Sequence, residues 1–176
     1  MLEDHILWWR SKRGSRRAFD LIYQKYVDMM LSVALHLLGN AGDAEDVVQE
    51  VFMSLVESPE TIKLRGRLKG FLAVCVANKS RDLLRRRKLT PTGREDRVPA
   101  DYDEPLELVI RSEQILRLRD ALRRLPYEQQ EVITLRIHAG LTFRALARAL
   151  QVPLGTVQSR YRYGLNSLKT ELERED

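Results

Sequence analysis

Apolar side chains recur along most of the chain at intervals of three and four residues, the spacing of an amphipathic α-helix. Residues 15–38 show this pattern first, and Gly39 follows them as a helix-ending residue. Asp43 is placed to cap a second helix over residues 44–57, which carries one continuous apolar stripe. After a basic, glycine-containing connector, a third helix is expected over residues 71–88. These three helices predict a small N-terminal domain.

The pattern stops at residues 89–106, where three prolines and a glycine leave no periodic apolar face to bury. Helical spacing resumes from about residue 106 to residue 125, and a further helix is expected over residues 126–139. No segment alternates convincingly as a strand, and we find no internal repeat. The sequence therefore predicts an all-α fold of two small helical domains, residues 1–88 and 107–176, joined by a flexible linker at 89–106.

Residues 142–170 have the layout of a helix-turn-helix, with a short helix capped by Thr142, a tight turn and a longer helix starting near Gly155. At 100° per residue, the second helix turns one set of side chains inward, namely Val157, Tyr161, Gly164 and Leu168. The opposite face carries Ser159, Arg162, Tyr163 and Asn166. These side chains can reach base edges or phosphates if the helix lies in a major groove. The alternative is that they form an ordinary solvated surface.

The net charge of +5 is distributed in blocks, and the blocks indicate more than the total. Residues 61–97 carry twelve basic side chains against three acidic ones, a density that suits a phosphate backbone. The alternative for the basic helix end is that its cations only complement the helix dipole. Residues 41–60 carry six acidic side chains and no basic one. That acidic helix face would repel DNA within a Debye length of about 10 Å, so a partner bound there is expected to be a protein. The alternative is that the face is only a solvated surface.

Several other classes of function are disfavoured. The single cysteine, Cys75, excludes an internal disulfide and lies in an apolar run, as expected for a core residue rather than a redox sensor. The histidines are scattered without metal-ligand spacing, and no nucleophile with a base or phosphate loop is recognisable, so we expect no metal, no cofactor and no enzyme activity. Without an apolar run of 18 residues or a signal peptide, the protein is expected to be cytoplasmic, with no membrane insertion. Trp8 and Trp9 are expected to pack on the first domain.

Three segments resemble, in the same order, the conserved parts of extracytoplasmic-function (ECF) sigma factors of bacterial RNA polymerase. DAEDVVQEVFMSL (43–55) resembles the polymerase-binding segment of region 2, and GFLAVCVANKSRDLLRRR (70–87) resembles its promoter-melting helix. LPYEQQEVITLRIHAGLTFRALARALQVPLGTVQSRY (125–161) resembles region 4. The resemblance implies a factor that binds core RNA polymerase and promoter DNA, reading the minus-ten element as single strand and the minus-thirty-five element as duplex.

The resemblance also implies roles for individual residues. The clamp helices of the polymerase's largest subunit would contact the acidic helix face at Asp46, Gln49 and Glu50. Asn78 would contact a minus-ten base that is flipped into a pocket lined by the connector. The whole minus-ten set comes from the connector and the basic helix and comprises Ile62, Lys63, Arg65, Asn78, Arg81, Arg85 and Arg86. The minus-thirty-five set lies in the second helix of the helix-turn-helix and comprises Thr156, Gln158, Ser159, Arg160, Arg162 and Tyr163.

The sequence departs from the family where it has Phe71 instead of a common Trp, Ala77 instead of Arg, and Tyr163 instead of a cation, which leaves the promoter sequence open. Members are often held inactive by an anti-sigma factor, a further possible partner. Two rival hypotheses remain: a one-component DNA-binding regulator of a symmetric site, and an interaction module independent of nucleic acid. The sigma hypothesis requires that the acidic face be accessible and that the two domains not be fused into one rigid core that cannot span both promoter elements.

Overall fold

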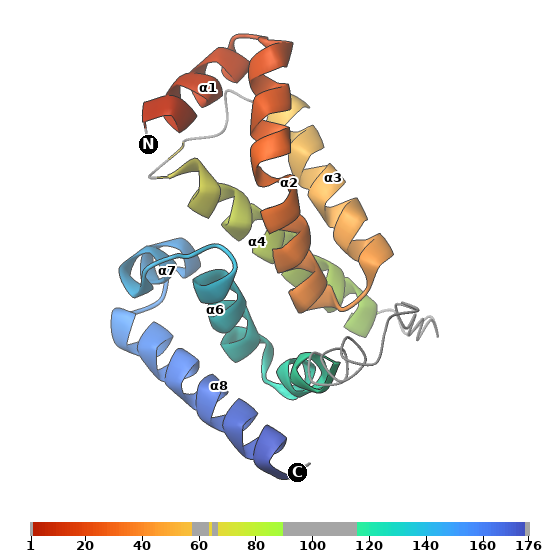
Figure 1. The fold of residues 1–176 in the computed structure, drawn as a ribbon, viewed down its shortest axis with the longest axis vertical. Coiled ribbons are helices and arrows are strands. Elements are labelled where there is room, and N and C mark those ends of the chain that lie inside the picture. Colours follow the sequence, from red (N-terminus) through yellow and green to blue (C-terminus); the bar gives the residue numbers. More distant parts are fainter. Residues whose placement is uncertain (1, 58–63, 65–66, 90–115, 175–176) are drawn as a thin grey trace, which may run out of the picture.

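The computed structural model describes residues 2–57, 64, 67–89 and 116–174, and within them every regular element is a helix (Figure 1). The expected all-α fold is thereby confirmed. The linker at 89–106 and the start of the helix expected from residue 106 lie outside the described residues, apart from Leu89. The helices are α1 (Leu2–Lys12), α2 (Arg16–Leu38), α3 (Ala41–Glu57), α4 (Leu68–Leu89), α6 (Tyr127–Ile137), α7 (Phe143–Leu150) and α8 (Leu154–Arg174), with residues 116–124 also helical.

Helix α1 was not predicted, because its inward face mixes polar with apolar residues. Asp4 and Ser11 lie on that face with Leu7 and Trp8, whereas the apolar Ile6 is exposed. Its anchor is Trp8, which is buried with its ring centroid 6.5 Å from that of Phe71 on α4. Trp9 is 54% exposed, and the Arg13 guanidinium lies 4.0 Å from its ring centroid. The expectation that both tryptophans pack on the first domain is therefore correct for Trp8 and wrong for Trp9.

The caps of α2 and α3 follow from local side-chain chemistry. The Ser15 hydroxyl accepts a hydrogen bond from the Ala18 amide at 3.3 Å, and Gly39 ends α2 in the left-handed conformation at φ 71°. The predicted cap at Asp43 is wrong, because α3 begins two residues earlier and Asn40 accepts the Asp43 amide hydrogen bond at 2.9 Å. The carboxylate of Asp43 is instead held by two hydrogen bonds of 2.6 Å from Arg87 at the end of α4.

The N-terminal half is built around α2, which packs against α1, α3 and α4 (Figure 1). The apolar stripe predicted for 44–57 is buried as expected, including Val48, Val51 and Phe52. On α2, Ile22 and Met30 are fully buried. Burial of such side chains stabilises a fold by about 1.5–3 kcal/mol each, so this core holds the three predicted helices in place.

The C-terminal half closes against the N-terminal half instead of standing apart from it (Figure 1). Helix α6 contacts α2 and α4, and α7 contacts α4. The main hydrophobic core therefore includes residues of both halves, with Val132, Leu135, Ala139, Leu146 and Val157 contributed by the C-terminal half. A second, smaller cluster lies within that half, at Ala121, Leu122, Leu125, Ile133 and Leu168. The linker expected at 89–106 allows the two halves to close on each other, but the sequence did not indicate which residues would meet. Because the halves share one core in this arrangement, engagement of both promoter elements requires them to separate.

Polar contacts accompany the apolar ones between the two halves. The His36 and His138 rings lie 4.0 Å apart, and His138 Nδ1 is hydrogen-bonded to the Ser32 hydroxyl at 3.1 Å. The Gln130 side chain donates a 2.6 Å hydrogen bond to the His36 carbonyl oxygen.

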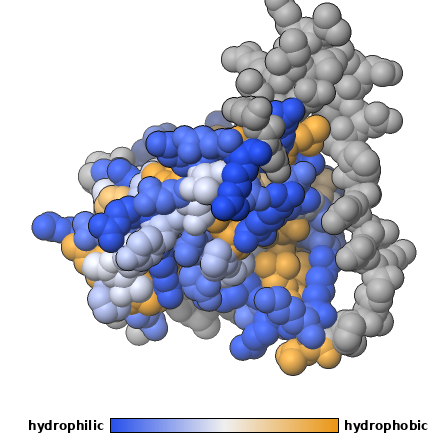
Figure 2. Space-filling model, turned by 90° about the horizontal axis from the view of Figure 1, so that it is seen from below, coloured by the Kyte–Doolittle hydropathy of each residue, from blue (hydrophilic) through white to orange (hydrophobic). Residues whose placement is uncertain are grey.

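Hydrophilic residues dominate the face of the molecule in Figure 2, with hydrophobic residues visible between them. None of the helices that the model describes has a stretch long and apolar enough to span a bilayer.

Candidate functional site

The acidic face of α3 points to solvent. Its buried stripe faces α2 and α4, and the helical period therefore turns Asp46, Gln49 and Glu50 outward, where all three are exposed. The Glu50 carboxylate forms a 3.0 Å ion pair with Lys79 of α4, also at the surface. The structure thus places the three residues expected to contact polymerase together on one accessible surface.

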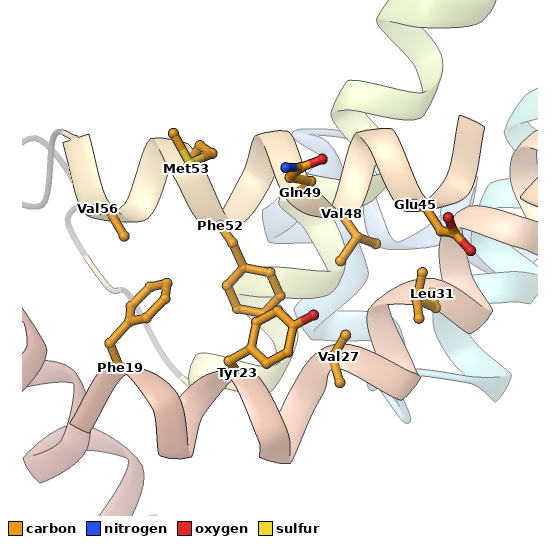
Figure 3. A pocket seen from close by; sticks show the side chains of 10 residues that line it. All are labelled: Phe19, Tyr23, Val27, Leu31, Glu45, Val48, Gln49, Phe52, Met53 and Val56. Atoms are coloured by element: carbon orange, nitrogen blue, oxygen red, sulfur yellow. The ribbon is translucent and has the colours of Figure 1, made fainter. Parts of the chain in front are cut away.

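An apolar groove of about 550 Å³ lies beside this surface, between α2 and α3 (Figure 3). Gln49 lines it, and the rings of Phe19, Tyr23 and Phe52 point toward one another within it, with the Tyr23 and Phe52 centroids 4.7 Å apart. Tyr23 is one of the apolar positions that predict the helix over residues 15–38, but the structure leaves it 45% exposed. Sequence reasoning missed this groove, because periodicity does not tell a buried apolar residue from one that rims an opening.

Helix α4 presents the candidate minus-ten residues that the structure describes. Asn78 is exposed on the helix, and Arg85 and Arg86 are exposed at its C-terminal end. Arg85 is 4.0 Å from the Asp82 carboxylate, a surface pair that contributes little to stability. The other expected members of this set, in the connector at 62–65, lie outside the described residues: Ile62, Lys63 and Arg65.

Arg81 differs from its neighbours, because its guanidinium forms an ion pair with Glu131 of α6. The Glu131 side chain is 1% exposed, and Arg81 is 45% exposed. Burial raises the pKa of Glu131, while the adjacent Arg81 acts in the opposite direction. The Tyr127 ring lies 5.6 Å from the same guanidinium, and its hydroxyl donates a 3.0 Å hydrogen bond to the Ala77 carbonyl oxygen. Sequence reasoning did not identify Glu131 as part of any site.

The helix-turn-helix has the expected form. The Thr142 hydroxyl caps α7 by accepting from the Ala145 amide at 3.2 Å, and Gln151 turns the chain at φ 56°. On α8 the predicted inward residues Val157, Gly164 and Leu168 are buried. Tyr161 is partly buried, with its ring 5.2 Å from that of Phe143.

The candidate minus-thirty-five residues separate into two groups on α8. Gln158, Arg162 and Tyr163 are exposed, and the Arg162 guanidinium lies 5.2 Å from the Tyr163 ring centroid. Partly buried, by contrast, are Thr156, Ser159 and Arg160. The Ser159 hydroxyl donates to the Thr156 carbonyl oxygen at 2.9 Å, within the helix. The structure therefore brings the first group to one accessible face and leaves the second less available.

Cys75, which was expected to be a core residue, has surroundings that are typical of one. Cys75 is partly buried, and burial raises its pKa to about 11, so the thiol stays protonated near neutral pH. In the part of the chain that the model describes, no group of three His, Cys, Asp or Glu side chains has the geometry to hold a metal ion.

Comparison with known proteins identifies both halves of the chain. Residues 22–90 match the model of the family Sigma-70 region 2, and residues 121–170 match that of Sigma-70, region 4. The RNA polymerase sigma-H factor of Pseudomonas aeruginosa is 27% identical over 169 residues, covering 90% of this chain and 88% of its own length. The ECF RNA polymerase sigma factor SigE of Mycolicibacterium smegmatis is 31% identical over 159 residues, covering 88% of this chain and 62% of its own.

Solved structures with the same fold include CnrH, in complex with the cytosolic domain of CnrY, at a TM-score of 0.77 and 21% identity over 99% of both chains. The sigma factor RpoE of Bartonella quintana, in complex with the anti-sigma factor NepR, has a TM-score of 0.71 and 22% identity over 88% of this chain and 96% of its own. Both family models and the ECF relatives identify the same kind of protein. The chain therefore belongs to the ECF sigma factors, which are transcription initiation factors of RNA polymerase and not enzymes.

Proposed function

We propose that this sigma factor docks on the clamp helices of core RNA polymerase through the acidic face of α3 and directs initiation at promoters that it reads at two elements. Residues 1–88 form the domain that binds polymerase and melts the minus-ten element. Residues 107–176 read the minus-thirty-five element as duplex, and residues 89–106 link the two domains. The observation that carries the proposal is that the described candidate residues lie on three different helices: those for polymerase on α3, those for the minus-ten element on α4 and those for the minus-thirty-five element on α8.

The acidic face of α3 is suited to contact with the surface of another protein. Asp46 and Glu50 are exposed carboxylates, and Gln49 connects them to the apolar groove. A charged rim beside an apolar recess is the usual composition of a protein interface. DNA would be repelled from the same carboxylates. Polymerase docking on α3 therefore leaves the basic surfaces for the promoter.

The minus-ten role rests on Asn78 and the cations that follow it. An asparagine amide can both donate to and accept from a base edge. Arg85 and Arg86, at the end of the same helix, supply charge for phosphates. Extruding a base from the stack costs a few kcal/mol, so such contacts are needed to offset it.

The minus-thirty-five role rests on the exposed face of α8. Helix-turn-helix proteins place the second helix of the motif in the major groove. Gln158 and Arg162 carry side chains that pair with base edges there, and Tyr163 can donate to a phosphate.

Reconstitution with core polymerase and a promoter library tests the proposal. We expect promoter-specific transcription that core alone does not give. Asp46→Arg should abolish core binding, whereas Glu57→Arg, an equal change of charge at another exposed position of α3, should not. Transcription no greater than with core alone, together with nanomolar binding of the isolated protein to a palindromic duplex, would replace the proposal with the regulator hypothesis.

We also propose that the protein acts in the cytoplasm and has an anti-sigma partner. The support is that RpoE, which has the same fold, was solved in complex with the anti-sigma factor NepR. Affinity purification of the chain from its own cells, followed by mass spectrometry, should recover a partner that purified core polymerase displaces. Recovery of core polymerase subunits alone would contradict this part of the proposal.

A further inference from the structure

The outward face of α1 carries apolar and basic side chains that belong to none of the surfaces described above. Ile6 and Trp9 lie one helical turn apart on this face and are 44% and 54% exposed. Arg10 is exposed on the same face, four residues after Ile6, and Arg13 follows where the helix ends. We define the α1 patch as these residues together with two exposed arginines at the start of α2, hence as Ile6, Trp9, Arg10, Arg13, Arg16 and Arg17.

The charge of the α1 patch is positive and is not neutralised by its neighbours. Residues 10–17 carry five basic side chains and no acidic one. Within the part of the chain that the structure describes, Arg10, Arg16 and Arg17 form no ion pair. The two carboxylates at the start of α1 are both bound by Lys25, at 3.2 and 2.8 Å, and are thus directed away from these arginines. A surface of this kind favours an anionic partner.

The apolar part of the patch favours a lipid over a nucleic acid. A nucleic acid would stack a base on Trp9, but the Arg13 guanidinium already lies over that ring, 4.0 Å from its centroid. Ile6 has neither a flat ring for stacking nor a group that hydrogen-bonds to a base. At a bilayer surface, by contrast, tryptophan lies at the level of the headgroups, aliphatic side chains enter the acyl boundary, and arginines bind lipid phosphates.

The position of α1 leaves this face open to a flat surface. Helix α1 packs on α2 and α4 through its opposite face, which carries the buried Trp8. In Figure 1 it lies at the opposite end of the molecule from the C-terminal end of α8, and α3 lies on the other side of α2. The α1 patch is therefore separate from the acidic face of α3, which an anionic membrane would repel.

We propose that the α1 patch attaches the free protein to the surface of an anionic phospholipid membrane. Ile6 and Trp9 enter the boundary between headgroups and acyl chains, and the arginines of the patch bind lipid phosphates. The attachment is peripheral, with α1 lying along the surface. Because it uses two apolar side chains and a few cations, it is reversible and weakens as salt rises. The inference goes beyond the proposed function and does not depend on it, since no residue of the patch belongs to the polymerase or promoter sets.

The test uses the full-length protein and vesicles made of equal parts of phosphatidylglycerol and phosphatidylcholine, with vesicles of phosphatidylcholine alone for comparison. Flotation measures binding. Quenching of tryptophan emission by lipids that are brominated in their acyl chains measures entry of Trp9 into the bilayer, because Trp8, the other tryptophan, is buried. Trp9→Ala removes the exposed ring. Its matched control is Tyr163→Ala, since Tyr163 is also 54% exposed and lies 5.2 Å from the guanidinium of Arg162.

A second pair of variants tests the charge. The double substitution Arg10→Gln and Arg13→Gln removes two cations from the α1 patch. The double substitution Arg85→Gln and Arg86→Gln removes two from the exposed end of α4, so the net charge of the protein changes equally. Circular dichroism checks that all variants keep their helices. If Trp9→Ala does not, the arginine variants decide by the same flotation measurement.

We expect the wild-type protein to bind vesicles that contain phosphatidylglycerol, with quenched tryptophan emission, and not to bind phosphatidylcholine alone. Trp9→Ala should weaken binding about tenfold, as expected for partial burial of an aromatic ring, and Tyr163→Ala should not. Removal of Arg10 and Arg13 should weaken binding about thirtyfold, roughly fivefold for each cation. The arginine variant of α4 should bind like the wild-type protein.

Binding that falls equally with both arginine variants would overturn the inference, because adsorption would then reflect net charge alone. Binding without quenching, or equal binding by Trp9→Ala and Tyr163→Ala, would do the same. Fluorescence anisotropy with a mixed-sequence single-stranded oligonucleotide tests the other anionic partner. If Trp9→Ala weakened oligonucleotide binding and left vesicle binding unchanged, the α1 patch would be a nucleic-acid surface and the proposal would be wrong.

Discussion

Replacement of Gly164 by leucine tests how closely α8 packs on α6. A Cβ atom at Gly164 would lie 2.6 Å from Ile133 Cδ1 and 3.2 Å from Gln129 Cβ. The terminal methyl group of Ile133 can move aside, but the Gln129 Cβ is fixed by its helix. Leucine therefore inserts a branched side chain where even one carbon is crowded.

Two opposing effects set the magnitude. Leucine in place of glycine within a helix gains about 1 kcal/mol of helix propensity. Overpacking a close contact costs about 1–3 kcal/mol. The difference is a net loss of up to about 2 kcal/mol of unfolding free energy for Gly164→Leu, whereas Gly164→Ala, which adds only the Cβ, should be close to neutral.

Urea denaturation followed by circular dichroism measures this effect, with Gly155→Leu as the control. Gly155 lies on the same helix, and a Cβ atom there would have no neighbour within 4 Å. The control should keep or gain stability. In thermal unfolding, the Tm of Gly164→Leu should be lower by roughly 2–4 °C for each kcal/mol of unfolding free energy that is lost. If Gly164→Leu proved as stable as Gly155→Leu, the close packing of α8 on α6 would be refuted.

Three further outcomes are expected. Met30→Ala, at a fully buried site, should lower the free energy of unfolding by about 2–5 kcal/mol in urea titrations, and a loss below 1 kcal/mol would contradict the packing described for α2. Asn78→Ala should impair open-complex formation, followed by permanganate reactivity, more than duplex binding, and equal loss of both would remove its single-strand role. Burial, and then the neighbouring His36, lowers the pKa of His138, so stability should fall as pH drops below the ordinary value of about 6.5. Between pH 7.5 and pH 5.5, the free energy of unfolding should fall less for His138→Gln than for the wild-type protein. Equal falls would exclude His138 as a source of the pH dependence.

Most of the helices were predictable because the signals that start, face and end them are local. The buried stripe of α3, the Ser15–Gly39 extent of α2, the Thr142 cap and the inward residues of α8 each depend on neighbours within a few positions. The exposed candidates on α3, α4 and α8 follow from the same helical periods, given the resemblance of their segments to sigma factors. Helix α1 escaped prediction because its inward face mixes polar residues with apolar ones.

The tertiary structure alone decided which surfaces meet. Closure of the two halves, the half-exposure of Tyr23 beside the groove, and the pairing of Arg81 with Glu131 join residues that are far apart in the chain. Periodicity reports only which side of a helix is apolar, and Glu131 has no feature in the sequence that distinguishes it from the exposed Glu128. Its burial results from where α6 packs against α4, a property of the whole fold rather than of any one segment.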